Sequence, residues 1–300
     1  MTKGAPLGHL FLYAVPLLLG NWLQLAYNAV DSIIAGRFIG QDALAAEGVA
    51  GPVMNLVILA ISGLCIGAGV LMSEAFGAKR TARLKETLAT TLLFGAALCC
   101  AAAALGCVLT PWILRALAVP DSIFGITGIY LRITFLGAPF TFFYNALAAG
   151  LKSVGDSKTP LIFLIFCSLL NVALDLLSVL IFELGVAGVA GATVIAQAVS
   201  AAVCIAYMFK KHPQLRLKKD DFKPDTAVLL RIFGMGAQMA LQGALLSVGM
   251  MVITRVINGF GANVVAAFTV GSNVQNLAVM LFSNFSSVSY THLRAHETRG

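Results

Sequence analysis

Two aspartates stand inside long apolar segments of this 300-residue chain, at positions where an ionisable side chain is costly and points to function. Asp31 lies late in the first apolar segment, and Asp175 lies within the fifth. Gln24, Tyr27 and Asp31 follow one another at spacings of three and four residues, which places them on one helical face. Asn171 precedes Asp175 by one helical turn, so these two side chains also share a face.

Paired carboxylates of this kind suit the binding of a proton or a cation. A carboxylate in a low-dielectric cavity binds a proton more readily than one in water, and two that share a cavity strengthen this effect. Neighbouring amides and hydroxyls tune it, and Thr193 and Asn145 are further candidates in other apolar segments. The set indicates cation-coupled transport, since hydrolysis would also need a nucleophile and a base. The alternative is that Asp31 and Asp175 only hydrogen-bond helices together.

Composition places these residues in a membrane. Hydrophobic residues make up 59% of the chain, charged residues only 11%, and the mean hydropathy is +0.90. A soluble domain carries roughly 25% charged residues, so lipid must be the solvent for most of this chain. The formal net charge of +7 comes from basic residues in short loops, which membrane topology explains better than a nucleic-acid partner.

The chain predicts an all-α polytopic membrane protein, because only helices satisfy their own backbone hydrogen bonds in each apolar segment. A helical span needs about 20 mostly apolar residues. Eight segments meet this condition, namely 10–35, 51–75, 88–109, 123–151, 160–182, 185–209, 227–257 and 264–288. Pro16 interrupts the first of them and predicts a bend there.

The loops predict the orientation. Those after the second, fourth and sixth segments carry most of the basic residues, while the opposite loops offer little besides Arg37 and Arg115. Basic loops stay on the cytoplasmic side, so we expect a multi-pass protein of the inner cell membrane with a cytoplasmic N-terminus. Glu74 at the cytoplasmic edge, and Glu47 and Glu183 at the outer edge, are expected to be solvated. Arg132 is expected to reach the outer interface by extending its side chain.

An internal repeat predicts two lobes. A shift of 221 residues aligns Gly40 with Gly261 and gives eight identities over the 24 positions 40–63. Repeats of this kind are common in transporters, and here they predict two six-helix lobes, or twelve helices when complete. The expected units are a first lobe (1–209), a cytoplasmic loop (210–226), the first two helices of a second lobe (227–288) and a non-native tail on a truncated chain (289–300).

Three stretches resemble the multidrug and toxic compound extrusion (MATE) transporters. They read NWLQLAYNAVDSIIAGRFIGQDALAA, YLRITFLGAPFTFFYNALAAGLKSVGDSKTP and SLLNVALDLLSVLIFELGVAGVAGATVIAQ, and 227–285 matches more loosely. The resemblance implies twelve helices in two lobes that alternate access as a drug/cation antiporter. In the proton-coupled prokaryotic branch, it implies a first-lobe site that matches Gln24, Tyr27, Asp31, Asn145, Asn171, Asp175 and Thr193, and a bend at Pro16.

The resemblance also implies the coupling ion. Asp31 and Asp175 would take up a proton, or sodium in some members, while the other matched residues would set their affinity and line the drug cavity. A sodium-coupled branch carries a glutamate in the seventh span, but here no acid lies between Arg231 and the tail. This departure favours coupling in the first lobe, with H+ expected before Na+.

The expected function is therefore efflux of amphipathic or cationic compounds by a non-enzyme that needs no cofactor or metal. The expected partners are these small molecules and the lipid bilayer, without nucleic acid, and the protein is expected to be monomeric. One alternative is a lipid-linked precursor flippase of the same superfamily, whose cavity would need several arginines where only Arg132 is a candidate. A second alternative, a non-transporting scaffold or sensor, would not need paired buried acids.

Overall fold

The computed structural model describes residues 19–276, apart from 21, 25, 219–220 and 223–224, and it omits the side chains of 238–240 and 242–243. Pro16 and the predicted tail lie outside the described residues. Long helices joined by short loops make up the described part: a first helix (19–34), the π-helical turn η1 (Ala35–Ile39), α2 (Gln41–Gly77), α3 (Thr81–Ala116), α4 (Asp121–Ser153), α5 (Lys158–Leu180), α6 (Gly185–Lys211), the 3-10 turn η2 (Pro213–Leu215), α7 (Thr226–Asn258) and helical residues 262–276.

Helices α2 to α6 are each long and apolar enough to cross a membrane, so the protein is an all-α polytopic membrane protein. The helices are longer than the predicted spans. For example, α2 begins at Gln41, ten residues before the predicted segment 51–75. Hydropathy marks only the length that lies in hydrocarbon, whereas backbone hydrogen bonds continue the helix into polar surroundings.

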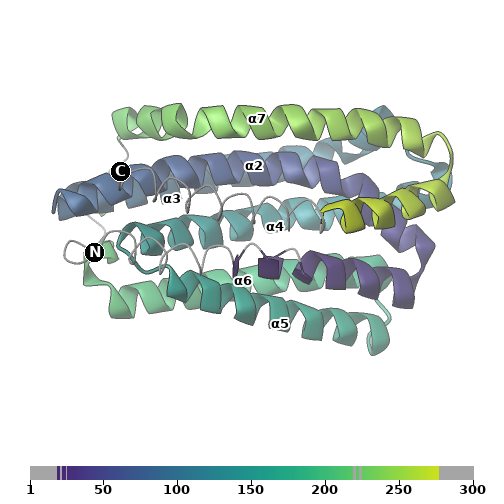
Figure 1. Ribbon diagram of the computed structural model, residues 1–300, viewed down its shortest axis with the longest axis horizontal. Helices are drawn as coiled ribbons and strands as arrows, with labels where there is room; N and C mark the ends of the chain where they lie inside the picture. Colours follow the sequence, from purple (N-terminus) through teal and green to yellow (C-terminus); the bar gives the residue numbers. More distant parts are fainter. Residues whose placement is uncertain (1–18, 21, 25, 219–220, 223–224, 277–300) are drawn as a thin grey trace, which may run out of the picture.

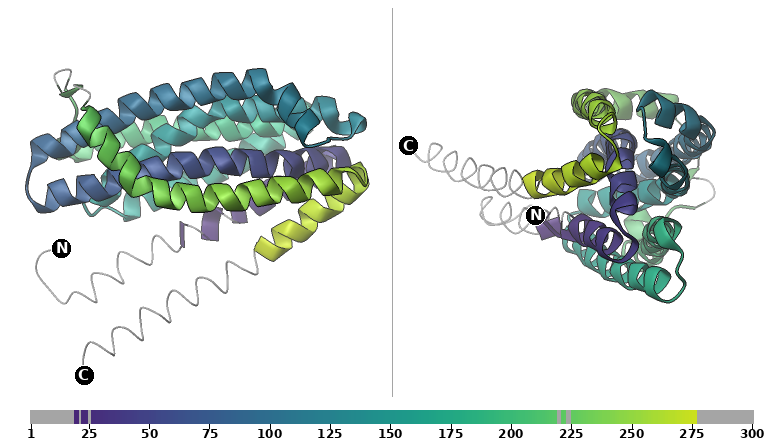
Figure 2. Two further views of the ribbon diagram at one scale, coloured as in Figure 1. Left: turned by 90° about the horizontal axis from the view of Figure 1, so that it is seen from above. Right: turned by 90° about the vertical axis from the view of Figure 1, so that its right-hand side faces the viewer.

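Helix α2 occupies the centre of the bundle. It packs against α4, α3 and α7, and α6 packs in turn against α4 and α5. Figure 1 shows these helices running along the long axis of the molecule, with α7 beside α2. Figure 2 shows the helical residues 262–276 turning back from the end of α7. A core with fully buried Met72, Leu88, Phe142 and Leu147 joins α2, α3 and α4.

Two observations support the predicted repeat. Gly40 and Gly261, which the 221-residue shift aligns, each stand directly before a helix with positive φ angles of 124° and 92°. Only glycine adopts such angles without strain. Gly48 and Thr269, also aligned by this shift, lie in direct contact, as expected where a two-fold axis relates two lobes.

The two predicted lobes approach closely where α2 meets α7. A Cβ atom added to Gly67 would collide with the backbone carbonyl of Ile232, and one added to Gly236 would collide with that of Gly63. Small residues at such contacts let two membrane helices pack backbone against backbone. The sequence thus uses glycine to seat the first helix of the second lobe against the centre of the first.

Polar contacts fix both ends of α7. At the end that carries the basic loops, called here the basic end, Lys85 pairs with Asp221 at 3.7 Å. At the opposite end, Asn258 Nδ2 donates to the carbonyl oxygen of Leu117 at 2.8 Å, and Arg255 donates to that of Ala116. These contacts come from loops on both sides of the bundle.

Candidate functional site

Asp31 and Asp175 meet in the interior of the first lobe. Asp31 belongs to the first helix and is 7% exposed, while Asp175 belongs to α5 and is fully buried. Their carboxyl groups lie within hydrogen-bonding reach of one another. One oxygen of each, Oδ1, is buried and has no hydrogen-bond partner among the described residues. The structure therefore brings together two acids that are 144 positions apart in the sequence.

An amide and two hydroxyls surround this pair of acids. Asn171 is fully buried one turn before Asp175. In the amide orientation that satisfies both sides, its nitrogen donates to Asp175 Oδ2 at 3.0 Å. Its oxygen then accepts from the hydroxyl and the backbone N–H of Thr193 on α6, at 3.1 and 3.2 Å. The hydroxyl of Tyr27 lies within hydrogen-bonding reach of Thr193. Asn171 thus joins α5 to α6 beside the acids.

A third carboxylate reaches the same region, and the prediction that Glu47 is solvated is wrong. Glu47 Oε1 accepts a hydrogen bond of 2.6 Å from the hydroxyl of Ser32, the residue after Asp31. Its other oxygen is buried without a hydrogen-bond partner among the described residues. Asn273 donates to Ser32 at 3.1 Å, so the second lobe contacts this cluster. Glu47 interacts electrostatically with Asp31 and Asp175.

The sequence did carry a signal for Glu47. It is surrounded by small residues in ALAAEGVAG, and Ala45, Ala46, Val49 and Ala50 are all fully buried. Such a run allows neighbouring helices to approach closely. A carboxylate within it is therefore covered by protein even though it lies only six residues from the start of α2.

The arrangement can hold one proton or one cation with little change in geometry. Two carboxyl groups in contact, away from water, resist carrying two negative charges, so one of them holds a proton or both share a cation. Asn171 supplies a donor to one side of the pair. The unpartnered oxygens leave the other side available for the bound ion.

Other predicted residues lie elsewhere. Gln24 is exposed, so the predicted shared face of Gln24, Tyr27 and Asp31 is buried only toward Asp31. Asn145 is partly buried and donates to the carbonyl oxygen of Thr141 on its own helix at 2.8 Å, rather than to Asp175. Arg132 is exposed and forms no ion pair in the part of the chain described.

The family follows from comparison with known proteins. The family model described as MatE matches residues 16–177, more than half of the chain, including both aspartates and Asn171. The chain belongs to the MatE family. Members of this family are transporters and not enzymes.

Relatives and solved structures agree with this assignment to the MatE family. The chain is 34% identical to "Probable multidrug resistance protein YoeA" of Bacillus subtilis over 90% of its own length, and 31% identical to "Probable multidrug resistance protein YpnP" of the same organism. It spans 60% of the length of each. A structure of the inward-facing conformation of a multidrug resistance MATE family transporter matches with a TM-score of 0.76 and 25% identity, covering 82% of this chain and 56% of that one.

A further MATE structure shows how well the fold agrees. The MATE multidrug transporter DinF-BH, solved in complex with another compound, matches with a TM-score of 0.86. That match covers 93% of this chain and 63% of the other at 24% identity.

Proposed function

We propose that this MatE protein exports amphipathic, often cationic compounds in exchange for an inward-moving cation, with protons rather than sodium as the coupling ion. The observation that carries the proposal is the contact between Asp31 and Asp175 in the interior of the first lobe. Two relatives named as multidrug resistance proteins support the substrate class. Because the chain spans 60% of their length, the transport cycle is proposed for a version extended to that length, called here the full-length version.

Coupling follows from competition for the charge of the acid pair. Protonation neutralises Asp31 or Asp175 and favours one packing of the first helix against α5. A bound cationic compound favours the charged pair and promotes loss of the proton. If drug binding weakens proton binding, proton binding must weaken drug binding by the same factor. Alternation between two conformations of the lobes turns this reciprocity into exchange.

Sodium is the less favoured ion because the described part of α7 carries no acid to complete a second site. The orientation proposed for the protein puts the basic end in the cytoplasm. In that orientation Asp31 and Asp175 lie in the half of the bundle away from the cytoplasm, so protons would reach them from outside. This agrees with inward movement of the coupling ion.

The experiment measures efflux of a fluorescent cationic dye from proteoliposomes containing the full-length version. Asp31→Asn should abolish efflux driven by an imposed pH gradient while the protein remains folded in the membrane. Asp42→Asn is the matched control, because Asp42 is exposed in the first turn of α2. Undiminished dye efflux in Asp31→Asn would refute the mechanism, and efflux driven by a sodium gradient alone would refute the choice of ion.

A further inference from the structure

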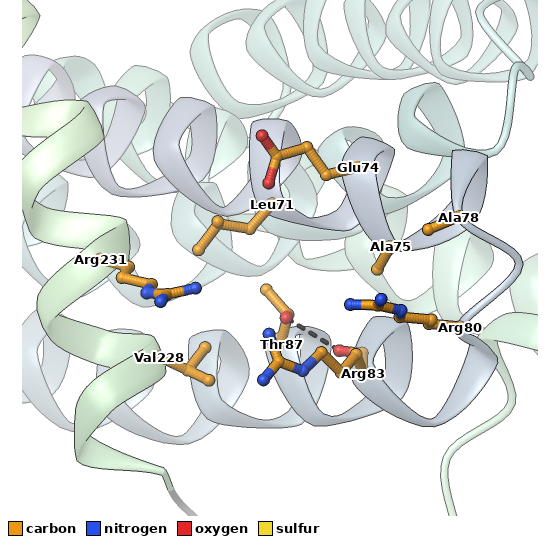
Figure 3. A pocket seen from close by; sticks show the side chains of 9 residues that line it. All are labelled: Leu71, Glu74, Ala75, Ala78, Arg80, Arg83, Thr87, Val228 and Arg231. Atoms are coloured by element: carbon orange, nitrogen blue, oxygen red, sulfur yellow. Dashed lines mark hydrogen bonds between the residues drawn. The ribbon is translucent and has the colours of Figure 1, made fainter.

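A pocket rich in arginine lies at the basic end, where the two predicted lobes meet. Figure 3 shows its lining, which comes from α2, from α3 with the residue before it, and from α7. Its volume is about 270 Å³. Arg80 and Arg231 extend toward each other from opposite walls, and Arg83 lies between them. The pocket lies far along α2 from the acid pair and is separate from the site described above.

The positive charge of this pocket is not neutralised by the protein. Three arginines face a single acid, Glu74, across the pocket. None of these four side chains forms an ion pair within the described ranges of the chain. Helix α3 also begins here, without a side-chain cap and without an acid in its first turn. Its free backbone N–H groups add positive potential.

The pocket walls are held in place by neighbouring contacts. Lys85 on α3 pairs with Asp221, and the backbone N–H of Asp225 donates to Thr90 Oγ1 at 3.4 Å. These contacts fix the start of α7 against α3. The remaining lining is mostly apolar, with Leu71 and Val228 beside the arginines. A charged cradle next to an apolar wall suits an amphiphile better than a simple ion.

We propose that this pocket binds the phosphate group of an anionic phospholipid headgroup, held by Arg80, Arg83 and Arg231. Guanidinium groups match phosphate oxygens in pairs, and basic pockets between membrane helices on the cytoplasmic side accept anionic headgroups. The pocket is at the level where α2 ends, α3 begins and α7 begins, which is the headgroup region for helices that span the bilayer. The apolar wall then faces the glycerol and the first part of the acyl chains.

A lipid bound here would connect the lobes. Arg80 and Arg83 belong to the first lobe and Arg231 to the second, so one phosphate would bridge them. This consequence, unlike the binding itself, rests on the proposed alternation of the lobes. In that cycle, an occupied pocket favours the conformation closed at the basic end.

The test measures lipid binding directly and does not depend on transport. The purified protein, in detergent, is titrated with phosphatidylglycerol, phosphatidylcholine or inorganic phosphate, and bound species are counted by native mass spectrometry. Phosphatidylglycerol should bind and phosphatidylcholine should bind more weakly. Each arginine replaced by glutamine should weaken binding about fivefold, and the triple variant R80Q/R83Q/R231Q about a hundredfold.

The matched control removes three other positive charges from the same end. Lys158, Lys210 and Lys211 are exposed there and do not line the pocket. The variant K158Q/K210Q/K211Q should bind phosphatidylglycerol within about twofold of the unchanged protein, since it leaves the three guanidinium groups in place. Replacing the three arginines with lysine should restore part of the binding lost in the glutamine variant.

Three outcomes would overturn the proposal. They are equal loss of lipid binding in the lysine control and the arginine triple variant, equal binding of phosphatidylglycerol and phosphatidylcholine, and binding of inorganic phosphate without binding of the lipid. If the triple variant fails to fold, R231Q alone decides, because Arg231 is exposed on α7 and its loss leaves the contacts at Asp221 and Asp225 in place.

Discussion

Replacing Asn171 by alanine should weaken the first lobe more than any other single polar substitution in the candidate site. Its side chain is fully buried and makes three hydrogen bonds, one to Asp175 and two to Thr193. Alanine would leave the carboxylate of Asp175 without its amide donor and would separate α5 from α6 at this level. Both effects act at the acid pair, so efflux by the full-length version should fall as well.

The magnitude follows from the number of bonds. Side-chain hydrogen bonds inside membrane proteins contribute roughly 0.6 to 1.7 kcal/mol each, so losing three should lower the free energy of unfolding by about 2 to 5 kcal/mol. Unfolding in mixtures of SDS and a mild detergent, followed by circular dichroism, measures this free energy. Adding Asp175→Asn to form a double-mutant cycle should give a coupling of about 1 kcal/mol or more between Asn171 and Asp175.

The matched control is Asn145→Ala. Asn145 is also an asparagine within a spanning helix, but its amide makes one hydrogen bond, to a carbonyl oxygen of its own helix. Its loss should cost about 0.5 to 1 kcal/mol. Equal destabilisation by the two substitutions, or a cycle without coupling between Asn171 and Asp175, would show that Asn171 does not organise the acid pair.

Three further substitutions test the remaining contacts. Glu47→Ala should lower the unfolding free energy by about 1 to 3 kcal/mol, because Ser32 loses its buried acceptor, whereas Glu47→Gln should retain most of it. Gly67→Ala should cost about 1 to 3 kcal/mol by forcing a backbone carbonyl of α7 away, while Gly51→Ala, whose new methyl group meets nothing, should not destabilise. Asn258→Ala should speed amide hydrogen exchange in the last turn of α7, and unchanged exchange would contradict a role for its bond to the α3–α4 loop.

The amino-acid sequence determined which segments lie in the membrane and which side chains share a helical face. Both depend only on local periodicity and on the cost of exposing polar groups to lipid. For this reason the existence and order of α2 to α7 agree with the prediction, as does the placement of Asn171 one turn before Asp175. The helix ends do not agree, because a helix continues beyond its apolar part.

The tertiary structure alone decided which of these faces meet. Asp31 and Asp175 share no local pattern, and their contact depends on how the first helix packs against α5. The same holds for Glu47, which looked exposed by its position near a helix start and is covered by the packing of small residues around it. The arginine pocket also depends on packing, since α7 brings Arg231 to residues that precede it by about 150 positions. Contacts between distant segments depend on side-chain shape across several helices, and single-helix periodicity carries no information about that shape.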